Sequence, residues 1–137
     1  MYFFNSDIED GRYPYYLLSS NQILDTKDEY LDYDYLINRE FEDIYVDDRI
    51  TNDINDVKWL HFADCMNNGG SSQLFIDFSP SETGEIGQII RIMLDTDDAR
   101  VINDDFDSFL DSIIDNNFKF LKDWVEHTVF LFYLLFF

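Results

Sequence analysis

Two histidines and one cysteine are the side chains best suited to acid–base or nucleophilic chemistry in this sequence. His61 lies within an alternating apolar run at 57–63, which favours a core or half-buried histidine over a catalytic one. His127 has only Glu126 as a near acidic neighbour. A serine or cysteine nucleophile needs a base held by a third group, and no such set stands out. We therefore predict no catalytic residue and expect a protein that is not an enzyme.

The run 95–100 begins like an EF-hand loop, but Ala99 stands where a ligand is needed and Arg100 replaces the required glycine. Phe106 replaces the closing glutamate, so we predict no specific metal site and no cofactor. With 29 acidic residues, two carboxylates at any spacing are uninformative. A carboxylate- or metal-dependent hydrolase stays open only as the last alternative.

The charge balance is the strongest compositional feature. Lys and Arg total 9, Asp and Glu total 29, and the formal net charge is -20. Such a chain repels nucleic acid and anionic membrane surfaces, and it attracts basic proteins. High net charge also keeps a protein dispersed, and composition alone leaves these two explanations open.

Length and cysteine content favour one domain in a reducing compartment. The 137 residues fit a single domain over 1–137, and Cys65 has no second cysteine with which to form an intramolecular disulfide. Residues 1–10 lack the basic and apolar regions of a secretory signal. The atypical apolar tail, 128–137, is too short to span a bilayer, which takes about 20 apolar residues. We expect a cytoplasmic protein whose tail is a buried strand or helix or an exposed sticky end, with a membrane anchor as the minor alternative.

The first half of the chain predicts helical structure. Ser19 and Gln22 fit a capping box, so we expect a helix over 20–33. Its buried face would hold Ile23, Leu24 and Leu31. The acidic stretch 40–56 has irregularly spaced apolar residues, which indicates a loop or a short solvated element.

The middle of the chain predicts strands. The run 57–63 alternates and would place Val57, Trp59, His61 and Ala63 on one face. The run 73–79 also alternates and would place Leu74, Ile76 and Phe78 on one side. Residues 88–94 are apolar at nearly every position, as in a central strand covered on both faces. Turn-rich segments separate these runs, which predicts an antiparallel meander over about 57–95.

The last predicted element is a helix near 104–121. Asn103 or Asp104 can cap it, and acids in its first turn suit the helix dipole. Apolar residues recur at helical spacing, at Phe106, Phe109, Leu110, Ile113, Ile114 and Leu121. A sheet packed against helices near 20–33 and 104–121 makes α+β the expected fold class.

The order of several short motifs resembles the SUKH superfamily. A strand begins near Trp59, a second strand ends in Asp77-Phe78-Ser79-Pro80, and the loop Gly84-Glu85-Ile86-Gly87-Gln88 follows. The helix around Phe106, Phe109 and Leu110 matches the family's "Ser-Phe-x-x-Phe-Leu"-like helix. The similarity covers roughly residues 13–114. The family usually begins with an amphipathic helix and a Leu-Pro turn, whereas here the sequence starts Met1-Tyr2-Phe3-Phe4.

The resemblance implies a function in protein binding. Many SUKH members resemble immunity proteins of bacterial polymorphic toxin systems, in which each binds a toxin domain, often a nuclease, and blocks it. Others are yeast regulators of cell-wall synthesis that act as scaffolds, so a regulatory adaptor is the alternative. The acidic composition suits the first role independently, because nucleases carry basic clefts for phosphates.

Two groups of candidate site residues follow from this interpretation. The family-motif residues are expected to be structural: Trp59, Asp77, Pro80, Gly84, Gly87, Gln88, Phe106, Phe109 and Leu110. Partner contact is expected from acids and an exposed aromatic side chain, since interfaces draw energy from a few aromatic anchors. These candidates are Tyr45, Asp47, Asp48, Asp53, Asp56, Asp97 and Asp98.

Overall fold

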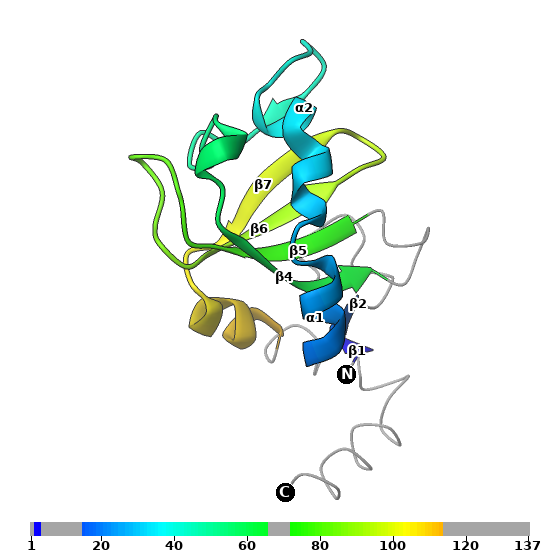
Figure 1. Cartoon of the computed structure of the whole chain (residues 1–137). Coiled ribbons are helices and arrows are strands. Elements are labelled where there is room, and N and C mark those ends of the chain that lie inside the picture. The colour runs from blue at the N-terminus through cyan, green and yellow to red at the C-terminus, as the bar shows by residue number, and fades with distance from the viewer. Residues whose placement is uncertain (1, 4–14, 66–71, 114–137) are drawn as a thin grey trace, which may run out of the picture.

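The computed structural model describes residues 2–3, 15–65 and 72–113. Within these residues, seven strands form one sheet in the order β1-β2-β4-β5-β6-β7-β3, with helices packed against it (Figure 1). The strands are β1 (Tyr2–Phe3), β2 (Tyr15–Leu17), β3 (Tyr45–Val46), β4 (Trp59–Cys65), β5 (Ser72–Asp77), β6 (Gln88–Met93) and β7 (Asp98–Asn103). The predicted α+β class is confirmed.

The centre of the sheet is an antiparallel meander. Strands β4, β5, β6 and β7 pair in sequence order, so the predicted meander is confirmed and extends by one strand beyond residue 95. Strand β7 was not predicted as a strand. It also receives β3 as a parallel neighbour, with Tyr45 opposite Asp98. The acidic stretch 40–56 therefore forms one edge of the sheet.

Strand β6 is covered on both faces, as its apolar sequence predicts. All six of its residues are buried, including Gln88 and Arg91. Ile90 and Ile92 point into one hydrophobic cluster, whereas Ile89 points into the other. This alternation makes β6 the wall between two cores.

A β-bulge changes the faces of β4. The register against β5 shifts between His61 and Ala63, so both Phe62 and Ala63 lie in the same hydrophobic cluster. Trp59 lies in the opposite cluster, and the His61 ring stacks on Phe75 with ring centroids 4.8 Å apart. The prediction that Ala63 shares a face with Trp59 and His61 is wrong, because the extra residue of a bulge breaks the two-residue period.

The N-terminal helical region is broken into short pieces. Its elements are α1 (Ser20–Thr26), the 3₁₀ helix η1 (Glu29–Tyr33) and α2 (Asp34–Ile37). The predicted capping box is present, with the Ser19 hydroxyl accepting from the Gln22 backbone and the Gln22 side chain accepting from the Ser19 backbone. Leu24 is 66% exposed and Leu31 is 51% exposed, so the prediction that they are buried is wrong. The tighter 3₁₀ turn shifts the helical phase and buries Tyr33, Leu36 and Ile37 instead.

Two hydrophobic clusters occupy opposite faces of the sheet. Figure 1 shows α1 and α2 running across one face, where Leu36 and Ile37 meet Trp59 and Phe75. Residues 40–56 contribute Val46 and Ile50 to this cluster, so the stretch is irregular, as predicted, but not wholly solvated. The 3₁₀ helix η2 (Ile54–Asp56) closes the segment.

The opposite face is covered by a helix at residues 106–113. Phe109 is fully buried there and meets Phe62 edge-on, with ring centroids 5.4 Å apart. The start of the predicted helix near 104–121 is thus confirmed. Its remainder and the apolar tail at 128–137 lie outside the described residues.

Candidate partner-binding surface

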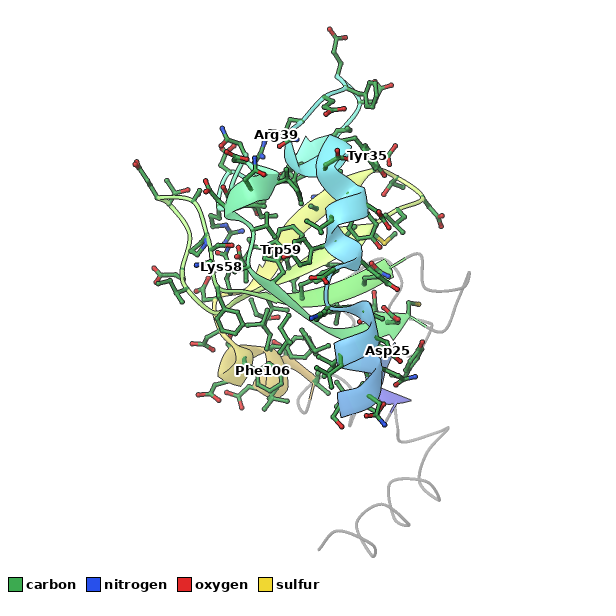
Figure 2. All side chains as sticks on the ribbon, viewed as in Figure 1. Asp25, Tyr35, Arg39, Lys58, Trp59 and Phe106 are labelled. Carbon is green, nitrogen blue, oxygen red and sulfur yellow. The ribbon has the colours of Figure 1, made fainter. Side chains whose placement is uncertain are left out.

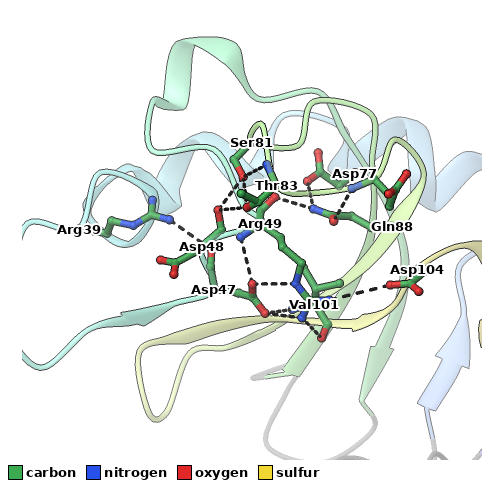
Figure 3. Close-up of polar contacts among 11 residues, drawn as sticks. Arg39, Asp47, Asp48, Arg49, Asp77, Ser81, Thr83, Gln88, Val101 and Asp104 are labelled. Atoms are coloured by element: carbon green, nitrogen blue, oxygen red, sulfur yellow. Dashed lines mark hydrogen bonds and ion pairs between the residues drawn. The ribbon is translucent and has the colours of Figure 1, made fainter.

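A buried pair of polar side chains holds the loop between β5 and β6. Asp77 and Gln88 face each other across the two strands and are both almost fully buried. Gln88 Nε2 donates to Asp77 Oδ2 at 2.8 Å and to the Arg49 carbonyl at 2.9 Å, and Gln88 Oε1 accepts from the Glu85 backbone (Figure 3). One side chain therefore ties together the 78–87 loop and the 47–51 segment.

Burial raises the pKa of Asp77, while hydrogen bonds from Ser79 and Gln88 act in the opposite direction. Its Oδ1 accepts from the Ser79 backbone at 2.8 Å. A carboxyl group at 0% exposure cannot reach a partner. The environment of Asp77 and Gln88 thus supports the structural role expected of them.

The glycines of this loop are needed for space and for backbone conformation. A Cβ atom on Gly84 would lie 2.5 Å from the Arg49 carbonyl oxygen and 2.7 Å from Pro80 Cβ. Gly87 adopts a φ of 91°, in a region that side-chain-bearing residues rarely occupy. Gly84 and Pro80 therefore lie where the 78–87 loop packs closely on the 47–51 segment, and Gly87 provides the backbone conformation that the loop needs before β6.

Of the other family-motif residues, Trp59 and Phe109 lie in the two hydrophobic clusters. Trp59 is buried between Tyr30 and Phe75, with ring centroids 6.1 and 5.3 Å away. Phe109 is fully buried, whereas Phe106 and Leu110, on the same helix, are each 36% exposed. The last two therefore combine packing with access to solvent.

Two adjacent acids on the 47–51 segment have different roles. The Asp47 carboxylate accepts from Arg49 Nε at 3.0 Å and Nη2 at 2.7 Å, and this pairing lowers the pKa of Asp47. The Asp48 carboxylate is exposed, while its backbone carbonyl accepts from the Ser81 and Thr83 hydroxyls (Figure 3). The structure therefore uses Asp47 internally and presents Asp48 to solvent from a fixed backbone.

Arg39 also stabilises the backbone of the 47–51 segment. It has a φ of 53°, and its guanidinium donates to the carbonyls of Ile37, Asp47, Ile50 and Thr51. The positive charge is thus used on backbone oxygens of the protein itself. These hydrogen bonds fix the backbone of the 47–51 segment.

A second group of candidate residues lies around the β6–β7 turn. Tyr45 is half exposed, and the Arg100 guanidinium lies 4.4 Å from its ring centroid. Asp97 has a φ of 49° and accepts from the Tyr35 hydroxyl at 3.1 Å. Asp98 lies 3.7 Å from Arg91 and 3.6 Å from Arg100. Both aspartates therefore have internal structural roles.

The remaining two candidates belong to η2. Asp53 caps its N-terminus by accepting from the Asn55 backbone, whereas the Asp56 side chain is exposed. The structure thus joins Tyr45 with Asp97 and Asp98 in one group, and Asp47 with Asp48 in another. It leaves Tyr45, Asp48 and Asp56 as the candidates that face solvent.

Sequence reasoning missed the exposed side chains of the 78–87 loop. Glu82 and Glu85 face solvent, Phe78 is 50% exposed and Ile86 is 76% exposed. The turn residues of this loop are evident in the sequence. The signal that was overlooked is Ile86, an apolar residue within the Gly84–Gly87 turn, where no strand or helix buries it.

The surroundings of His61 and of the described acids do not point to catalysis or to metal binding. His61 is 2% exposed, and its Nε2 lies 2.5 Å from Asp64 Oδ1 while Nδ1 lies 3.2 Å from Thr26 Oγ1. The expected core histidine is thus confirmed, whereas His127 lies outside the described residues. In residues 2–3, 15–65 and 72–113, no three His, Cys, Asp or Glu side chains form a group able to hold a metal ion. The same residues contain no helix with the length and hydropathy needed to cross a membrane.

The sheet, the two helical layers and the pinned β5–β6 loop define a small α+β fold, and comparison with known families places it in one of them. The model of the SMI1 / KNR4 family (SUKH-1) matches residues 2–112. The chain belongs to this family, and the resemblance noted from its motifs is confirmed. The search of curated proteins found no match.

Proposed function

We propose that this chain is an immunity protein that binds and neutralises a cognate bacterial toxin domain with a basic surface, such as a nuclease. The observation that carries the proposal is the unequal use of charge. The arginines among the described residues contact the protein's own groups, whereas most of the described carboxylates face solvent. Such a surface presents negative charge to a partner with little local compensation.

Each described arginine has an internal contact. Arg39 donates to four backbone carbonyls, and Arg49 pairs with Asp47 and lies 3.9 Å from Asp104. Arg91 and Arg100 both approach Asp98, and Arg100 also lies over the Tyr45 ring. The exposed cations in this part of the chain are Lys27, Lys58 and Arg100, and Arg100 is engaged by Asp98 and the Tyr45 ring.

This charge pattern suits inhibition of a nuclease. A nuclease cleft carries basic groups that hold phosphates, and carboxylates can occupy the same positions. Complementary charge also accelerates capture, which a cell that makes its own toxin requires. The protein would act in the cytoplasm as a binding partner and would have no turnover of its own.

Asp48 and Asp56 are the acids that we propose for direct contact, with Tyr45 as the aromatic anchor. All three are exposed, whereas Asp47, Asp53, Asp97 and Asp98 hold the surface in shape through internal hydrogen bonds. Charge reversal of Asp48 should therefore weaken binding without unfolding the protein. Replacement of Asp47 should affect stability first.

The test is co-expression in a bacterial host with a toxin domain encoded beside this gene, scoring survival and co-purification. We expect rescue together with a complex that survives purification. The matched control is a chain with Asp48→Lys and Asp56→Lys, which should fold and protect less well. Toxicity that persists in the presence of the folded, unmodified chain would contradict the proposal.

A regulatory adaptor is the second candidate, and one observation favours it. Large exposed apolar side chains lie on separate parts of the molecule, with Leu24 on α1, Phe41 before β3 and Ile86 in the β5–β6 loop. Several separated anchors suit several partners. An adaptor would bind more than one protein weakly and would neutralise no toxin.

A further inference from the structure

An apolar strip crosses the sheet beside the helix at 106–113. Leu60 and Ile76 are direct cross-strand partners on β4 and β5, so they share a face of the sheet. Phe78 follows Ile76 by two residues and continues the strip past the end of β5. Phe62 follows Leu60 on the same face and meets the ring of Phe106 at a centroid distance of 5.6 Å.

The outer members of this strip are open to solvent although they adjoin the core. Phe78 is 50% exposed and Phe106 is 36% exposed, while Leu60 and Ile76 are half-buried. Phe62 and Phe109 are buried, and both rings contact the ring of Phe106, which Figure 2 labels on the helix at 106–113. The strip is therefore an apolar surface on a rigid support, which is typical of a binding anchor.

We propose that the strip of Leu60, Ile76, Phe78 and Phe106 is a second hydrophobic anchor for the partner, in addition to Tyr45. The occupant would be a cationic protein segment that presents an apolar side chain flanked by Lys or Arg. This inference rests on the proposed function, because it names the part of the molecule that seats the toxin domain.

Charge identifies this occupant. Asp104, Asp105 and Asp107 flank Phe106 in the sequence, and all three are exposed. A basic segment laid on the strip would place its cations against these acids. A second copy of the chain would bring another formal charge of -20 against the same surface, which opposes self-association.

Lys58 is a cation close to the strip, and its replacement tests the charge of the proposed partner segment. The Phe78 backbone donates to the Lys58 carbonyl at 2.9 Å, so the two residues are neighbours across the β4–β5 pair. The Lys58 side chain is exposed. A cation at this place repels the proposed basic partner, and its replacement by an acid should strengthen binding.

The test measures the affinity of full-length variants for the purified toxin domain encoded beside the gene. Phe78→Ser and Phe106→Ser should each weaken binding at least tenfold, whereas Leu24→Ser and Phe41→Ser should change it less than twofold. The last two are matched controls, because Leu24 is 66% and Phe41 is 63% exposed away from the strip. Lys58→Glu should tighten binding severalfold at low salt.

The outcomes separate this inference from the function beneath it. If the unmodified chain does not bind the toxin domain, the proposed function is overturned, and the anchor with it. If the unmodified chain binds and the strip variants bind as tightly as the two controls, only the anchor is overturned. Lys58→Glu leaves the apolar core untouched, so weaker binding by this variant would overturn the cationic occupant even if Phe78→Ser failed to fold. A dimer that Phe78→Ser dissolves would assign the strip to self-association instead.

Discussion

The Gln88 amide group links the Asp77 carboxylate with the backbone of Arg49 and of Glu85. Gln88→Ala would leave Asp77 Oδ2, the Arg49 carbonyl and the Glu85 backbone N–H without this partner. Because unsatisfied buried groups are costly, we expect a loss of about 2–4 kcal/mol in the free energy of unfolding. Urea denaturation followed by tryptophan fluorescence measures it. Gln22→Ala, at an exposed helix cap, is the control and should cost about 1 kcal/mol. Equal losses would contradict the assigned role of Gln88.

Gly84 has no room for a side chain. In Gly84→Ala, the new methyl group would press on the Arg49 carbonyl at 2.5 Å, and we expect a destabilisation of about 1–3 kcal/mol. A Cβ on Gly87 would meet nothing within 4 Å, so Gly87→Ala would suffer only the backbone strain of its positive φ. The double variant Gly84→Ala, Pro80→Gly should stay destabilised, because the Arg49 carbonyl still meets the new methyl group. Thermal unfolding of the three variants checks this.

The Asp47 carboxylate should make stability depend on pH. Its pKa in the folded protein is lowered from 3.8, chiefly by hydrogen bonds from Arg49. Its contribution is therefore present above pH 3.8 and is lost as the pH falls through the lower folded value. We expect Asp47→Asn to be less stable than the unmodified chain at pH 7, by on the order of 1 kcal/mol, and the difference to shrink towards pH 3. A difference that is constant with pH would show that the ion pair is not its source.

At the scale of elements, Phe109 contributes more than its neighbours to the packing of the helix at 106–113 against the sheet. Phe109 is 0% exposed and contacts Phe62, so Phe109→Ala should cost about 3–5 kcal/mol. Leu110, on the same helix, is 36% exposed, and Leu110→Ala should cost about 1 kcal/mol. Denaturant midpoints of the two variants test the packing assignment. A larger loss for Leu110→Ala would mean that the helix packs through a different face.

The sequence predicted those elements whose periodicity is local. The alternation in 73–79 and the continuous apolar run in 88–94 were sufficient for β5 and β6, because each side of a strand can be assigned from neighbouring residues. The bulge between His61 and Ala63 could not be foreseen, since it depends on register against β5. The 3₁₀ turn of η1 likewise depends on burying Tyr33 against the sheet.

The acidic character of the candidate surface could be predicted from the sequence, but which of its acids face solvent could not. Asp47 and Asp48 are adjacent acids, and only the fold shows that Arg49 engages the first and leaves the second in solvent. The apolar strip joins Phe78 to Phe106 through strand pairing and ring contacts between residues far apart in the sequence. No local pattern carries that information.

For the whole molecule, net charge connects the structure to its proposed role. The arginines of the described residues contact the protein's own groups, so the surface left for the proposed partner is acidic. Electrostatic steering should then dominate the rate of association, while the apolar strip should govern dissociation. Stopped-flow experiments should show that the association rate constant falls steeply with salt. A dissociation rate constant that carried most of the salt dependence would contradict this division.

The central claim is that the chain neutralises a basic toxin domain by binding it. The most direct measurement is a titration of purified toxin activity with the purified full-length chain at low and at high salt. We predict that activity falls to zero at one equivalent at low salt, and that more chain is needed at high salt when toxin and chain are dilute. Full toxin activity in the presence of excess folded chain, at either salt concentration, would contradict it.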